Sequence, residues 1–107
     1  MRQDRLYGTL DALILKALVA GPRHGYGVAR WLEQMASGAL VIEDGSLYPA
    51  LYRLERRGWI EADWGMTELG RKARFYSMTR QGRRQLAAET EEWIAFSSIV
   101  TRVLSTA

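Results

Sequence analysis

Apolar residues recur at helical spacing in two segments of the first third of the chain. Between residues 9 and 20, apolar side chains stand at positions 10, 13, 14, 17 and 18, which places them on one face of a helix. Gly21 and Pro22 predict the end of this helix, because Gly accepts a left-handed cap and Pro cannot continue the hydrogen-bond ladder. A second helix is predicted from about Gly25 to Ala36, with Gly38 as its stop signal. Its inward side chains are Val28, Trp31, Leu32 and Met35.

A third helix is predicted from Ser46 to Arg57. Ser46 is a suitable N-cap, Pro49 fits the first turn, and Gly58 closes the helix. At 100° per residue the two sides of this helix differ strongly in character. The inward side carries Leu47, Ala50, Leu51 and Leu54. The outward side is aromatic and basic, with Tyr48, Pro49, Tyr52, Arg53 and Arg56.

After this helix the period changes from 3.6 to 2. Residues 59–64 alternate between apolar and acidic, residues 73–78 are also strand-like, and the polar stretch between them predicts a hairpin. Thr79 is a plausible N-cap for a last helix that runs from Arg80 nearly to the C-terminus, with Gly82 weakening its first turn by about 1 kcal/mol relative to Ala. Its apolar residues fall on a narrow heptad seam, which is typical of helix-to-helix packing. The seam residues are Leu86, Trp93, Phe96, Val100 and Val103.

Three helices followed by a two-stranded wing are typical of a winged helix-turn-helix domain. We therefore predict a mainly α fold with a small β-hairpin, divided into a winged helix-turn-helix domain over residues 1–79 and a C-terminal dimerisation helix over residues 80–107. The major groove of DNA admits one helix, and a hairpin can lie along the neighbouring backbone. The helix before the wing is then the recognition helix.

Composition bounds what such a protein can do. The chain has 107 residues, so its core is modest, and part of its stability is expected to come from a partner chain. It has no cysteine and a single histidine, His24, which leaves no basis for a disulfide framework, a thiolate or multi-histidine metal site, or a nucleophilic triad. We expect no catalytic residues, no metal and no cofactor. No run of 18 apolar residues exists, so we expect a cytoplasmic protein without a membrane span.

Charge is concentrated where a DNA-binding protein needs it. The net charge of +3 is the balance of a neutral segment over residues 1–52, a segment of +5 over residues 53–84 and one of −2 over residues 85–107. Residues 71–84 hold six basic side chains and no acid. The positive field thus lies on the recognition helix, the wing and the start of the last helix, where phosphate contacts are expected.

Several motifs resemble the PadR family of bacterial transcriptional regulators. They are GTLDALIL at 8–15, HGYG at 24–27, GSLYPALYRLERRG at 45–58, EADWG at 61–65, RKARFY at 71–76 and MTRQGR at 78–83. ETEEW at 89–93 is similar to the short, acidobacterial-type branch of that family. The chain departs from the family pattern at three positions. Leu69 stands at a wing tip that is small or polar in relatives, Ser77 replaces a common basic residue, and Trp59 replaces an aliphatic one.

The resemblance implies a homodimer that binds a pseudo-palindromic operator in double-stranded DNA and represses transcription. The DNA-contacting residues would come from the second helix, the recognition helix and the wing, and the last helix would dimerise through its seam. The implied DNA contacts are Tyr26, Ser46, Leu47, Tyr48, Pro49, Tyr52, Arg53, Arg71, Lys72 and Arg74.

Some roles stay open at the level of sequence. Arg53 could read a guanine or hold a phosphate. Trp93 and Phe96 fit either a dimer core or an aromatic site for a small apolar or phenolic effector. His24 fits a loop or capping residue, with a phosphate contact or a pH effect as the alternative. The competing hypothesis for the whole protein is a winged-helix adaptor that binds other proteins and not DNA.

Overall fold

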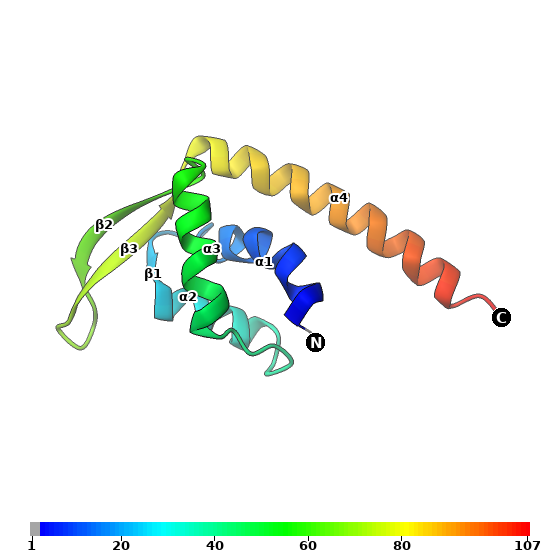
Figure 1. Cartoon of the computed structure of the whole chain (residues 1–107), viewed down its shortest axis with the longest axis horizontal. Coiled ribbons are helices and arrows are strands. Elements are labelled where there is room, and N and C mark those ends of the chain that lie inside the picture. The colour runs from blue at the N-terminus through cyan, green and yellow to red at the C-terminus, as the bar shows by residue number, and fades with distance from the viewer. Residues whose placement is uncertain (1–2) are drawn as a thin grey trace.

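The computed structural model describes the backbone of residues 3–107 and the side chains of residues 9–107. The described residues form four helices and a three-stranded antiparallel sheet (Figure 1). The helices are α1 (Gln3–Ala17), α2 (Gly25–Met35), α3 (Asp44–Arg56) and α4 (Arg80–Leu104). The strands are β1 (Arg23–His24), β2 (Ile60–Met66) and β3 (Lys72–Met78). The predicted fold class, a mainly α winged helix-turn-helix arrangement, is confirmed.

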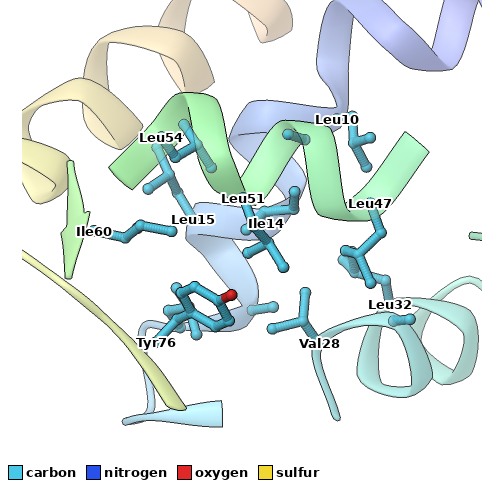
Figure 2. Close-up of a cluster of buried hydrophobic side chains, with 14 of the residues drawn as sticks. Leu10, Ile14, Leu15, Val28, Leu32, Leu47, Leu51, Leu54, Ile60 and Tyr76 are labelled. Carbon is cyan, nitrogen blue, oxygen red and sulfur yellow. The ribbon is translucent and has the colours of Figure 1, made fainter. Parts of the chain in front are cut away.

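The core lies where α1, α2 and α3 meet the base of the sheet. Leu10, Ile14 and Leu15 from α1 pack with Leu51 from α3 and with Ile60 at the start of β2 (Figure 2). Helical spacing had placed Leu10, Ile14 and Leu51 inward, because one apolar face per helix must be covered by another element. Leu15 is fully buried as well, although the predicted face of the first helix did not include it.

The sheet has one strand more than predicted. β3 lies in the middle, paired with β2 from Ile60 opposite Met78 to Met66 opposite Lys72, and with β1 at two positions only. β1 was not predicted, because two residues cannot display an alternating pattern. β1 ends against Phe75 and Tyr76 of β3, so residues 64–66 and 72–74 extend beyond it as the free part of the wing.

Helix α3 begins earlier than predicted. Asp44 is its first residue and Glu43 its cap, without a side-chain cap bond. Ser46 therefore lies inside the first turn and is not the N-cap, and its N–H bonds back to the Glu43 carbonyl at 3.0 Å. Pro49 consequently falls in the second turn, where it leaves the Gly45 carbonyl without its usual donor.

Hydrogen bonds of Thr79 join the end of α3, the base of the wing and the start of α4. Thr79 caps α4 as predicted, accepting the Gly82 N–H at 3.1 Å, and its hydroxyl donates to the Gly58 carbonyl at 2.7 Å. The Thr79 N–H bonds the Trp59 carbonyl at 3.0 Å. A side chain at Gly82 would collide with that same carbonyl. Gly82 is thus required by a close approach, and the prediction that it simply weakens the helix is incomplete.

From this junction the wing and α4 leave the body on opposite sides (Figure 1). The chain is elongated for its size, with extents of 55 × 29 × 22 Å. Only the first part of α4 lies over the body, so most of the helix projects with its side chains exposed.

Candidate nucleic-acid interface

The outward face of α3 is aromatic, as predicted. Tyr48 and Tyr52 are 47% and 60% exposed, and Pro49 is exposed between them. Arg56 lies over the Tyr52 ring at 5.7 Å and donates to its hydroxyl at 3.2 Å. A solvent-exposed face with two tyrosines, one of them held beside a cation, is suited to bases and phosphates, which offer flat rings and negative charge.

Two residues of α3 that were assigned to DNA contact are buried in the structure. Leu47 is 0% exposed and belongs to the core, so its position gives no support to a DNA contact. The physical reason is the helical period, which turns Leu47 inward together with Ala50, Leu51 and Leu54. Ser46 is only 8% exposed, and its position gives no support to a DNA contact.

Arg53 is tied to the body of the protein. Its Nη2 donates to Asp11 Oδ1 of α1 at 3.0 Å, and Arg57 Nη1 donates to Asp11 Oδ2 at 3.2 Å. One carboxylate thus holds the guanidinium groups of Arg53 in α3 and of Arg57, the C-cap of that helix, and sets their direction. Sequence reasoning missed this because Asp11 and Arg53 are 42 residues apart.

A groove of about 1270 Å³ runs between the start of α2 and the free part of the wing. We call it the α2–wing groove. Tyr26 on its α2 side is 64% exposed, with its ring stacked beside His24 at 6.3 Å between centroids and Arg30 over it at 5.8 Å. His24 also caps α2 by accepting the Gly27 N–H on Nδ1 at 3.1 Å, which confirms its predicted capping role. The groove is lined by residues 22–27, 30, 31, 34, 48, 64, 66–69 and 71–76.

Gly25 joins this groove to the recognition helix. A Cβ at Gly25 would lie 2.8 Å from the Tyr48 ring, so any other residue there would have to displace that ring from the start of α2. The exposed Tyr26 and Tyr48 are thereby brought to one groove from two different helices. Arg30 was missed in the sequence analysis, although its i, i+4 spacing from Tyr26 was the available signal.

The wing contributes its cations unequally. Arg71 and Lys72 are exposed, and Lys72 Nζ lies 5.4 Å from the centre of the Trp64 ring. Arg74 instead pairs with Glu55 of α3 at 2.9 Å, which braces the wing against the recognition helix. Burial raises the pKa of the neighbouring Tyr76 phenol, with the Arg74 guanidinium opposing that shift and the Glu55 carboxylate adding to it. We infer that Arg74 shapes the site, while Arg71 and Lys72 are available to a ligand.

The predicted seam on α4 is part of a wider apolar surface. Trp93, Phe96, Val100 and Val103 are exposed, and the Trp93 and Phe96 rings lie 6.4 Å apart between centroids. Leu86 differs, because it is half-buried against the core of its own chain, and its predicted place in a dimer interface gains no support. The sequence analysis omitted further exposed apolar residues of the same helix, which are Ile94, Ile99 and Leu104.

The described part of the chain holds neither a cluster of metal-ligating side chains nor a helix able to span a membrane. Among residues 9–107, no three histidine, aspartate or glutamate side chains gather in a way that could hold a metal ion. None of the described helices combines the length and apolar character that crossing a membrane requires.

Three helices, a wing and a basic aromatic face together define a winged-helix protein of the transcription-regulator class. The model of the PadR-like family of transcriptional regulators matches residues 14–88, and the chain belongs to this family. The predicted family resemblance is thereby confirmed, while its assignment to the acidobacterial branch stays a prediction.

Solved structures agree with this assignment. A transcriptional regulator from Clostridium thermocellum is 27% identical, with a TM-score of 0.84 over 94% of this chain and 97% of that one. A PadR-like transcriptional regulator from Bacillus cereus is also 27% identical, with a TM-score of 0.84 over 98% of this chain and all of the other. An uncharacterised protein from Lysinibacillus sphaericus is 29% identical over 100 residues, which cover 94% of this chain and 92% of that protein.

Proposed function

We propose that this regulator acts as a homodimeric repressor that binds a pseudo-palindromic operator. The observation that carries the proposal is that the exposed Tyr48 of α3 lines the α2–wing groove together with the exposed wing cations Arg71 and Lys72. Tyr52 and Arg56 are exposed on the same face of α3. A helix with such a face reads bases, and exposed cations beside it hold phosphates.

In this proposal α3 enters the major groove and the α2–wing groove receives the sugar-phosphate backbone. Tyr26 and Arg30 would hold one phosphate from the α2 side, and Arg71 and Lys72 would hold others from the wing. Arg53 is oriented by Asp11 at 3.0 Å, so it would present a fixed donor to a guanine or a phosphate and lose little rotamer freedom on binding. Arg74 is assigned a bracing role, because Glu55 already holds it.

Dimerisation is proposed to occur through α4. Isolated exposed apolar residues are ordinary, but a helix that projects from the body with Trp93, Phe96, Val100 and Val103 on one side is a surface that a second copy can cover. A two-fold dimer would place two copies of α3 about 34–36 Å apart, in successive major grooves. The protein is then a cytoplasmic DNA-binding regulator without catalytic activity.

DNA binding is tested on the sequence upstream of the protein's own gene. Footprinting should reveal a protected two-fold site, and log K should fall with log salt by about 0.9 for each phosphate contact. Arg71→Gln and Lys72→Gln should each make that slope shallower by about 1. Arg102→Gln removes the same charge at the far end of α4 and should leave the slope unchanged. A flat salt response, or no preference over random duplex, would contradict the proposal and favour the adaptor function.

The dimer is tested by light scattering. Trp93→Glu should convert a dimer to a monomer, because it places a charge in the apolar surface. Ser98→Glu is a matched control, since at 100° per residue Ser98 lies on the opposite side of α4 from the seam. A monomeric wild type, or dimers that persist in Trp93→Glu, would refute α4 as the interface.

An effector site remains a second candidate role for Trp93 and Phe96, favoured by their 6.4 Å ring separation at an exposed position. Repeating the footprint with small apolar and phenolic compounds tests it. Release of DNA by a compound in the wild type, but not in a dimeric Phe96→Leu variant, is the expected result.

A further inference from the structure

The free end of the wing carries large apolar side chains in solvent. Leu69 at the tip is 83% exposed, and Trp64 and Met66 behind it are 66% and 63% exposed. All three line the α2–wing groove on its wing side. A single exposed leucine needs no explanation, but three large apolar side chains on one small hairpin form a surface that favours contact with a partner.

Three hydrogen bonds close the turn at the wing tip. The Thr67 N–H donates to the Arg71 carbonyl at 2.8 Å, and the Gly70 N–H donates to the Thr67 carbonyl at 2.9 Å. The Thr67 hydroxyl accepts the Arg71 N–H at 3.1 Å, and Gly70 adopts the left-handed φ of 76° that closes the turn. Leu69 is therefore presented by an ordered turn, and inserting it into a partner would cost little additional ordering.

Charge around the tip favours a polyanion over an apolar protein surface. Arg71 and Lys72 follow Leu69 directly and are exposed, while Glu68 is the acidic residue of the turn. Residues 64–66 and 72–74 form three strand pairs beyond the end of β1, which carries the tip about 10 Å from the body at 3.3 Å per residue. The minor groove of DNA is about 6 Å wide and 7.5 Å deep, so a tip of this length can reach its floor.

We propose that Leu69 acts as a wedge that enters the minor groove beside the operator half-site and partly unstacks one base step. This inference rests on the proposed DNA-binding function and adds a specificity determinant to it. Arg71 and Lys72 would hold the phosphates on either side of the groove, and Leu69 would fill the opened step. An apolar wedge gains contact area when a step opens and bends the duplex toward the major groove.

The wedge predicts sequence preference at a position where no hydrogen bond is made. Pyrimidine–purine steps such as TA unstack easily, whereas GC steps resist. The wild type should therefore bind an operator with TA under the wing about tenfold more tightly than one with GC, which is the scale set by burying a leucine side chain. A fluorescent adenine analogue placed at that step should brighten on binding.

The test compares variants of the intact protein on both operators, with the wing position first located by footprinting. Leu69→Ser should lose the TA preference and the fluorescence change, and Leu69→Met should keep both, because it preserves an apolar wedge. Glu68→Gln is the charge control. It should strengthen binding to both operators equally and leave the preference intact, because it removes a like charge beside the phosphates. Leu69 is exposed, so these variants are expected to fold, and their melting curves verify it.

Failure of the wedge differs from failure of the proposed function. Specific operator binding in which Leu69→Ser keeps the TA preference overturns the wedge alone, as does wild-type binding without brightening of the analogue. A change of oligomeric state in Leu69→Ser also overturns it, since the tip would then contact a second copy. Absence of any specific DNA binding in the wild type overturns both proposals.

Discussion

Gly82, in the first turn of α4, reverses the usual effect of a glycine in a helix. Replacing a helical glycine with alanine normally stabilises a protein by up to about 1 kcal/mol. Here a Cβ would overlap the Trp59 carbonyl oxygen, and it would also lie 2.9 Å from Met78 Cγ and 3.0 Å from the Trp59 carbonyl carbon. The Trp59 carbonyl oxygen and Met78 Cγ leave no room for a methyl group at position 82, because the Trp59 carbonyl belongs to the backbone at the start of the wing.

The size of the destabilisation expected for Gly82→Ala follows from the hydrogen bonds at the junction of α3, the wing and α4. To admit a methyl group, α4 must move away from Trp59, which strains the Thr79 N–H bond to that carbonyl at 3.0 Å and the Thr79 hydroxyl bond to Gly58 at 2.7 Å. Overpacking of this kind costs about 1–3 kcal/mol, which exceeds the gain in helix propensity. Gly82→Ala should therefore lower the free energy of unfolding by about 1–2 kcal/mol.

Urea unfolding followed by circular dichroism measures this change, at one protein concentration because self-association would shift the midpoint. Gly45→Ala is the control, since nothing lies within 4 Å of a Cβ at Gly45 in α3. That variant should be as stable as the wild type or more stable. A Gly82→Ala protein that matches or exceeds the wild-type stability would refute the steric argument.

Three further substitutions test other parts of the structure. Leu47→Ala should lower the free energy of unfolding by about 2–5 kcal/mol in urea, as expected for a buried core side chain, whereas a purely DNA-contacting residue would leave it unchanged. Asp11→Asn should cost less than about 1 kcal/mol of stability because its ion pairs are partly exposed. It should nevertheless reduce the ratio of operator to random-DNA affinity in a competition assay, and an unchanged ratio would speak against a positioning role. Tyr76→Phe should lessen the loss of stability above pH 10, measured by thermal melts at alkaline pH. The raised pKa of Tyr76 in the folded state stabilises the protein at pH values below the ordinary pKa of 10.0, and this stabilisation is lost as the phenol ionises at higher pH. Equal slopes of stability against alkaline pH for the two proteins would count against this argument.

Local sequence patterns were sufficient to predict most of the helices and strands. The inward leucines of α3, the Thr79 cap and the alternation of β2 are each set by neighbours within a few residues, so their signals are readable in the sequence. The start of α3 was misplaced because Ser46 carries the chemistry of a cap while the chain turns two residues earlier, at Asp44. Cap residues are preferences, and packing of the helix against the core decides which residue is first.

Only part of the candidate site could be predicted from the sequence. The exposed tyrosines Tyr48 and Tyr52 and the wing cations Arg71 and Lys72 lie where the pattern predicted, because exposure on a helix or hairpin follows from its period. Leu47 was included through the family motif although the same period turns it inward. A motif records which residues stand together in sequence, and it does not distinguish those that touch a ligand from those that hold the helix in place.

The sequence by itself determined the class of fold, the inward face of α3 and the concentration of positive charge on residues 53–84. Tertiary structure decided which of those charges are available. It brought Asp11 to Arg53 across 42 residues and Glu55 to Arg74 across 19, and it brought the start of α4 so close to Trp59 that only glycine fits. Periodicity is a property of one segment, whereas an ion pair or a steric contact depends on the path of the chain between two segments. Only the folded structure shows that path.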